Sequence, residues 1–146
     1  MASHLYDQEL HPRRHQALQG GACYFMVTLT LGWFMGPIRD FAVRMGADPL
    51  LAILCQAIAT LLILVWAAGW VVDAFDVPNR IGARAVVGFG AIALLLACDF
   101  LTGYLMFGMT PAMMGAHFLG PQGAVVGLSL LLAALLPMAR SWPDAR

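Results

Sequence analysis

The sequence predicts an all-α integral membrane protein with four transmembrane helices and a short interfacial helix between the third and the fourth. Of its 146 residues, 61% are hydrophobic and only 11% are charged, whereas a typical soluble domain is about 25% charged. The hydrophobic residues form four long runs that are almost free of charge. A soluble fold of this size needs far more polar surface, so we expect a single domain that lies in a lipid bilayer.

The N-terminal residues 1–21 predict a polar cytoplasmic tail. This segment holds most of the histidines and two arginines, and its apolar content is low. Pro12 and the Gly20-Gly21 pair both favour breaks in regular structure, so they argue against one continuous helix here.

The first transmembrane helix is expected at about residues 22–43. Its apolar core, Ala22–Ile38, is at the lower limit for crossing a hydrocarbon layer of roughly 30 Å. We therefore expect the helix to continue past Pro37, which brings Arg39 to the edge of the membrane.

The second and third helices are expected at about 49–72 and 84–107. Asp48 and Pro49 suit the N-cap and the first turn of a helix. Trp66 and Trp70, near the other end of the second run, are typical of anchors at a membrane interface. The third run contains a single charge, Asp99.

The segment after the third helix is too irregular to span a membrane and too apolar for an ordinary loop. Prolines and glycines interrupt Gly108–Gln122, and we expect an interfacial helix at 112–119 within it. The fourth helix is expected at about 123–138, and residues 139–146 predict a cytoplasmic C-terminal tail. The membrane domain thus covers residues 22–138.

The arginines predict the orientation. Two lie in the N-terminal tail, two in the second loop and two in the C-terminal tail, against two in the first loop and none in the third. The positive-inside rule therefore places both termini in the cytoplasm. All eight basic residues are arginines, which favours a GC-rich bacterial source and hence a multi-pass protein of a bacterial inner membrane.

Several classes of chemistry lack support in the sequence. The formal net charge is zero, so no nucleic-acid partner is expected. Cys23, Cys55 and Cys98 lie alone in separate apolar runs and indicate small core side chains. His117 stands alone in the predicted interfacial helix, and Pro12 separates His11 from His15. We therefore expect no metal, no cofactor and no catalytic residues.

Asp99 is the most informative residue. A carboxylate within a span costs about 2.5–3.5 kcal/mol on insertion scales, so something must compensate for it. We expect either a proton or cation site, or a structural role in a buried ion pair or in a hydrogen bond between helices. Arg39 is the best partner, because the first and third helices run in the same direction. Asp40 competes for Arg39, but neighbours on one helix do not face each other.

Other polar and small residues predict contacts between helices. Gln56 in the second span is expected to form a hydrogen bond with a neighbouring helix, with a substrate contact as the alternative. Gly32-x3-Gly36 and Gly123-x3-Gly127 have the spacing that lets helices approach closely. That approach is expected within this chain or against a partner chain.

The chain resembles a group of small, uncharacterised four-span membrane proteins of alphaproteobacteria. The resemblance rests on four features: Gly32-x3-Gly36-Pro-Ile-Arg39, the acid at 99, Pro121-x-Gly-Ala-Val and Leu-Leu-Pro137-Met. It covers about Gly32–Met138. The chain departs from the group at Pro37, where the group has threonine, at Asp99, where it has glutamate, and at 120–123, where it has an acidic turn. The resemblance implies the topology and the pairing of Arg39 with the acid, and it implies no activity.

These features favour a non-catalytic accessory or assembly subunit of a larger membrane complex. Its partners would be the lipid bilayer and other integral membrane subunits, or further copies of the chain. The alternative is a small oligomeric transporter or channel that couples to protons or cations through Asp99. Catalysis is disfavoured because the polar residues are scattered rather than convergent.

Overall fold

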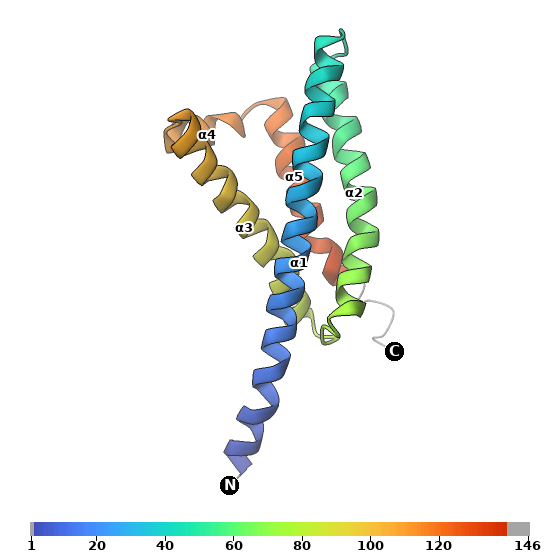
Figure 1. Cartoon of the computed structure of the whole chain (residues 1–146), viewed down its shortest axis with the longest axis vertical. Coiled ribbons are helices and arrows are strands. Elements are labelled where there is room, and N and C mark those ends of the chain that lie inside the picture. Colours follow the sequence, from blue (N-terminus) through green and yellow to red (C-terminus); the bar gives the residue numbers. More distant parts are fainter. Residues whose placement is uncertain (1, 140–146) are drawn as a thin grey trace.

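The chain folds into five helices joined by short connections (Figure 1). The computed structural model describes the backbone of residues 2–139 and the side chains of residues 15–116 and 118–139. The helices are α1 (Ala2–Arg44), α2 (Pro49–Ala74), α3 (Ile81–Phe107), α4 (Pro111–His117) and α5 (Pro121–Ala139). No strand occurs in residues 2–139, so the all-α prediction is confirmed.

Four helices within the described residues are long and apolar enough to span a membrane: His15–Arg44 of α1, and all of α2, α3 and α5. This confirms the prediction of four long apolar helices and fits a multi-pass membrane protein. A short helix, α4, stands between the third and fourth spans, in the segment where an interfacial helix is expected. The predicted C-terminal tail lies outside the described residues apart from Ala139.

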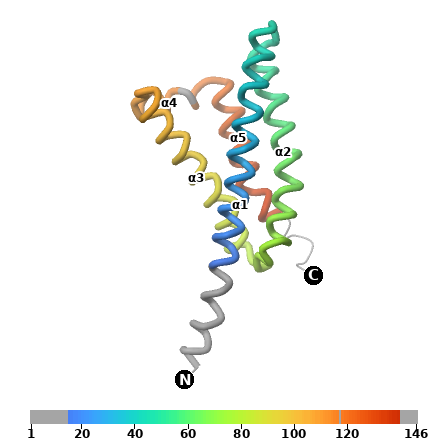
Figure 2. The backbone as a smooth tube through the Cα atoms, viewed as in Figure 1, coloured from blue at the N-terminus to red at the C-terminus, as the bar shows by residue number. Residues whose placement is uncertain are grey.

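The long helices form a bundle in which α1 and α5 are diagonal to each other. Each of these two packs against both α2 and α3. The lower end, in the view of Figure 2, carries the connection 75–80, and the upper end carries the connection 45–48 together with α4. Towards the upper end, α3 leans away from the other long helices.

The expectation that the N-terminal segment is broken is wrong. The helix α1 runs without interruption through Pro12 and the Gly20-Gly21 pair. The two glycines lie where α1 packs closely on its neighbours: a Cβ on Gly20 would lie 3.2 Å from Cγ2 of Val77, in the connection 75–80, and 3.4 Å from Cγ1 of Val71 on α2. Their small size serves packing, and the packing outweighs their weak intrinsic preference for helix.

The starts and ends of the helices follow local chemistry. Asp48 caps α2 as expected, because its Oδ1 accepts hydrogen bonds of 2.9 Å from the N–H groups of Leu50 and Leu51. Thr110 caps α4 in the same way. Gly108 ends α3 in the left-handed region, at φ 60°, which glycine adopts without strain. As expected, α1 continues past Pro37.

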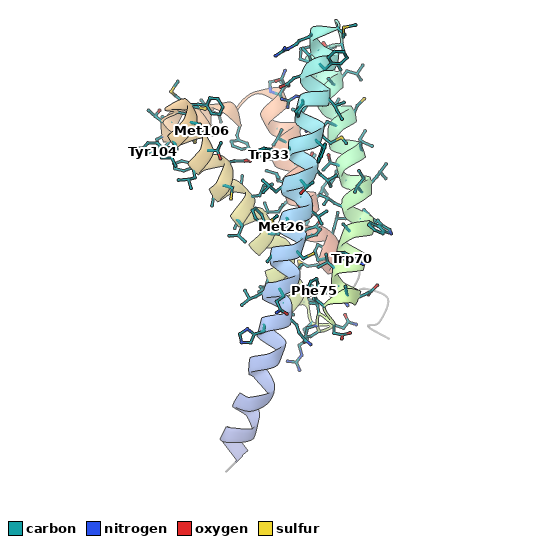
Figure 3. The ribbon with its side chains drawn as sticks, viewed as in Figure 1. Met26, Trp33, Trp70, Phe75, Tyr104 and Met106 are labelled. Carbon is teal, nitrogen blue, oxygen red and sulfur yellow. The ribbon has the colours of Figure 1, made fainter. Side chains whose placement is uncertain are left out.

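The buried core lies mainly in the lower half of the bundle. Its members are contributed by all four long helices, and they include Tyr24, Leu64, Val87 and Ala134. In the upper half, large apolar side chains are exposed, among them Trp33 on α1 and Tyr104 and Met106 on α3 (Figure 3). Fewer residues of the upper half are therefore buried within the chain.

Candidate functional site

The helices α3 and α5 cross in close contact at Gly88. A Cβ on Gly88 would overlap the backbone of Ala134 on α5. At the same level Gly21 of α1 meets α3, since a Cβ on Gly21 would lie 3.6 Å from Cα of Val87. Sequence reasoning missed both contacts, because isolated glycines within apolar runs do not show which of them face another helix.

A hydrogen bond joins the two diagonal helices just below the centre of the bundle. The hydroxyl of Tyr24, whose side chain is 0% exposed, donates to the carbonyl oxygen of Ala133 at 2.9 Å. In a regular helix that carbonyl would accept from the N–H of residue 137, but Pro137 has no N–H. Tyr24 thus supplies the donor that the proline removes. Pro137, within the fourth apolar run, was the signal in the sequence that the carbonyl of Ala133 would lack its helical donor.

Higher along α1, beyond the buried Thr28, the helix becomes more exposed. Gly32 follows Gly21 by about three helical turns, so both glycines lie on the same side of α1. At Gly21 this side touches α3, but at Gly32 no neighbouring atom lies within 4 Å of the place that a Cβ would take. Gly36, one turn further on, is equally free. The side of α1 that faces α3 below is therefore uncovered above.

Asp99 lies on the side of α3 that, lower in the bundle, packs on α5 at Gly88. The buried residues of α3 include Gly88, Ile92 and Leu95, and Asp99 and Thr102 continue this stripe at helical spacing. Both are nevertheless exposed, because α3 has separated from the bundle at their level. We call the two uncovered surfaces in the upper half, at Gly32 and Gly36 of α1 and at Asp99 and Thr102 of α3, together the open face.

Asp99 has no hydrogen-bond or ionic partner among the described residues. The expected pair with Arg39 is not formed. Arg39 instead donates through Nε and Nη2 to Oδ1 of Asp40, at 3.0 and 2.7 Å. The expectation that these neighbouring side chains point apart is wrong, since the long arginine side chain folds back along the end of α1. The carboxylate of Asp99 therefore stays exposed and unpaired within its span.

The predicted packing glycines divide into two groups. Gly32, Gly36 and Gly127 have no other atom within 4 Å of a Cβ position, so they do not mediate close packing within this chain. Gly123 is buried at the start of α5. The close contacts expected at the small residues are formed at Gly88 and Gly21 instead.

Two further polar side chains lack partners inside the bundle. Oε1 of Gln56 is buried and accepts no hydrogen bond, so the expected bond to a neighbouring helix is not formed at this atom. Arg84 is only 6% exposed, and its Nε and Nη1 have no partner. Arg84, one of the two arginines counted with the second loop, lies in the first turn of α3 on its core-facing stripe.

No group of metal-binding side chains occurs in the described part of the chain. His15 is exposed, whereas the side chains of His11 and His117 lie outside the described residues. Within the described side chains, the distinctive chemical feature is an exposed, unpaired carboxylate within an apolar helix.

The chain matches no protein-family profile, no curated protein and no solved structure.

Proposed function

We propose that the protein is a non-catalytic accessory or assembly subunit that binds another integral membrane chain through its open face. The exposed, unpaired carboxylate of Asp99 carries this proposal. It lies about 12 Å from the upper end of α3, at 1.5 Å per residue, which is within the span. A carboxylate at such a depth is unfavourable unless a donor or cation compensates for it.

The compensating group is best supplied by a different protein. Among the described arginines of this chain, Arg39 is bound to Asp40, Arg84 is buried at the lower end, and Arg44 lies at the very end of α1. A second copy packed on the open face would bring its own Asp99, whereas a different chain can place a cation at that depth. The partner is a transmembrane helix with an arginine, lysine or amide side chain at the level of Asp99.

The shape of the open face supports a helix as the occupant. Gly32 and Gly36 leave the backbone of α1 accessible, and this spacing of small residues lets a second helix approach closely. At this level α3 leans away from α1 (Figure 1). Packing and interhelical hydrogen bonds are the main forces that join helices in lipid, and the open face offers both.

The location that we propose is a bacterial inner membrane, with both termini in the cytoplasm. The arginine distribution supports it, with six arginines on the side of the termini and two on the other. In this orientation α4 lies along the outer interface, with the exposed side chains of Met113, Phe118 and Leu119 in the headgroup region.

A second candidate is a small oligomeric carrier or channel for protons or cations. The same observation favours it, because ion-coupled membrane proteins place carboxylates within their spans. It differs in requiring that Asp99 lie on a path accessible to water and that the chain assemble with itself.

Extraction of the tagged protein from its native membrane in mild detergent, followed by a native gel and mass spectrometry, tests the proposal. We expect a stoichiometric larger assembly that Asp99→Asn dissociates and that Asp76→Asn leaves intact. Asp76 is a matched control because it is exposed, lies outside the spans, and has a φ of 47° that asparagine adopts readily.

The two candidates give different results in this experiment. Migration as a homo-oligomer, with proton flux in liposomes that Asp99→Asn abolishes, would favour the carrier. A single chain without flux would contradict both candidates.

A further inference from the structure

A pocket of about 370 Å³ lies at the upper end of the bundle, among α1, α2 and α5. Its polar lining consists of Arg39, Asp40, Arg44, Gln122 and Gly123. Neither the open face nor the core uses this pocket. Its volume falls in the range of small-ligand sites.

The pocket has an excess of positive charge. Arg39 is neutralised by Asp40, to which it donates two hydrogen bonds. Arg44 has no ionic partner among the described residues. Because a guanidinium keeps its charge at every accessible pH, the pocket carries a net charge of about +1, which favours an anion.

The first turn of α5 adds donors to the same space. Ala124 is the first residue of α5 whose N–H bonds back along the chain, to the carbonyl of Gly120. The N–H groups of Gln122 and Gly123 precede it, and first-turn groups of this kind bind anions. Gly123 has no side chain to cover them.

The remaining side chains that line the pocket are apolar. Val43, Ile53 and Val126 line it, one from each helix. The pocket also lies at the membrane boundary, because Pro49 and Pro121 begin the apolar helices α2 and α5 on either side of it. A ligand that fits has an anionic head at the level of the arginines and an apolar portion beneath.

We propose that this pocket binds a phosphate group, either that of an anionic lipid headgroup or free phosphate. Arg44, with the N–H groups of Gln122 and Gly123, holds the phosphate oxygens. Asp40 opposes binding in two ways: its negative charge repels the phosphate, and it accepts the hydrogen bonds of Arg39. The aliphatic lining favours the lipid over the free ion. This inference is independent of the proposed function.

Native mass spectrometry of the full chain in non-ionic detergent tests the proposal. Phosphatidylglycerol and zwitterionic phosphatidylcholine are titrated separately, and inorganic phosphate is then added as a competitor. We expect phosphatidylglycerol to bind more tightly than phosphatidylcholine. Arg44→Gln should weaken its binding about fivefold, the effect of one basic residue at a membrane surface.

Three comparisons make the result decisive. Asp40→Asn should strengthen phosphatidylglycerol binding about fivefold, whereas a merely misfolded variant would lose it. Arg80→Gln removes an exposed arginine at the opposite end of the bundle and should change nothing. Displacement of the lipid by millimolar phosphate would identify the free ion as a ligand, and resistance to it would identify the lipid.

Two outcomes would overturn the proposal. One is equal binding of the two lipids together with no binding of phosphate. The other is an equal effect of Arg44→Gln and Arg80→Gln.

Discussion

The hydroxyl of Tyr24 donates a 2.9 Å hydrogen bond to the carbonyl oxygen of Ala133, the acceptor that Pro137 leaves without a helical donor. One phenol thereby joins α1 to α5, which are diagonal in the bundle and pack mainly on α2 and α3. The contact lies below the level at which α3 separates. It fixes the lower half of the bundle while the upper half stays open.

Tyr24→Phe should lower the free energy of unfolding by about 1 kcal/mol, because it leaves the buried carbonyl of Ala133 without a donor. Unfolding in detergent, followed by circular dichroism, measures the change. Tyr104→Phe is the control, since Tyr104 is exposed on α3, and it should have no effect.

The role of Pro137 is tested by a double-mutant cycle. Pro137→Ala restores the N–H that bonds to the carbonyl of Ala133, so Tyr24→Phe should cost less in that background than in the wild type. Strict additivity of the two substitutions would show that the proline and the phenol are unrelated.

Gly88→Ala should destabilise the protein by about 1–3 kcal/mol, because its Cβ overlaps the backbone of Ala134 and the helices must move apart. Gly90→Ala is the matched control, two residues along α3 with nothing within 4 Å. It should be neutral or stabilise by up to about 1 kcal/mol through helix propensity. Equal effects in thermal unfolding would contradict the close crossing of α3 and α5.

Arg84→Met should leave the stability unchanged or raise it, because it replaces a buried cation that lacks partners at two nitrogens by an apolar chain of similar volume. Arg84→Ala should be about 2 kcal/mol less stable than Arg84→Met, since it leaves a cavity. A loss of about 3 kcal/mol or more in the methionine variant would indicate that Arg84 is paired.

Asp99→Asn should change the stability of the isolated chain by less than about 0.5 kcal/mol, as expected for an exposed side chain without partners. If Asp99 formed the buried pair with Arg39, removing its charge would cost about 3–5 kcal/mol. Equilibrium unfolding of the purified protein in detergent distinguishes these values.

Hydropathy predicted the four long helices, and local chemistry predicted the start of α2 at Asp48 and Pro49. The continuous α1 was not predictable from Gly20 and Gly21, because their effect depends on whether another helix packs against them. The same two glycines would weaken an isolated helix, but they stabilise a helix that packs closely on its neighbours. The positions of Val71, Val77 and Val87, which pack against the two glycines, decide between these outcomes.

The candidate site was predicted in part. The charge of Asp99 within an apolar run predicted that this residue has a special role. The spacing of Gly32 and Gly36 predicted a surface for contact with another helix. The predicted ion pair between Asp99 and Arg39 was wrong because it depends on the tilt of α3. No local sequence pattern predicts that tilt. The bond from Tyr24 depends on which carbonyl faces it across the bundle, and that too is a property of the assembled helices.

The most direct test of the open face is site-specific photocrosslinking in the native membrane. A photoreactive amino acid replaces Thr102, on the open face, or Trp66, which is exposed on α2, a helix that takes no part in the open face. We predict an adduct to a different membrane chain from position 102 and none from position 66. Asp99→Asn should abolish that adduct, and the crosslinked helix should carry a basic or amide side chain. Adducts only to lipid or to a second copy of this chain would contradict the proposed role of the open face.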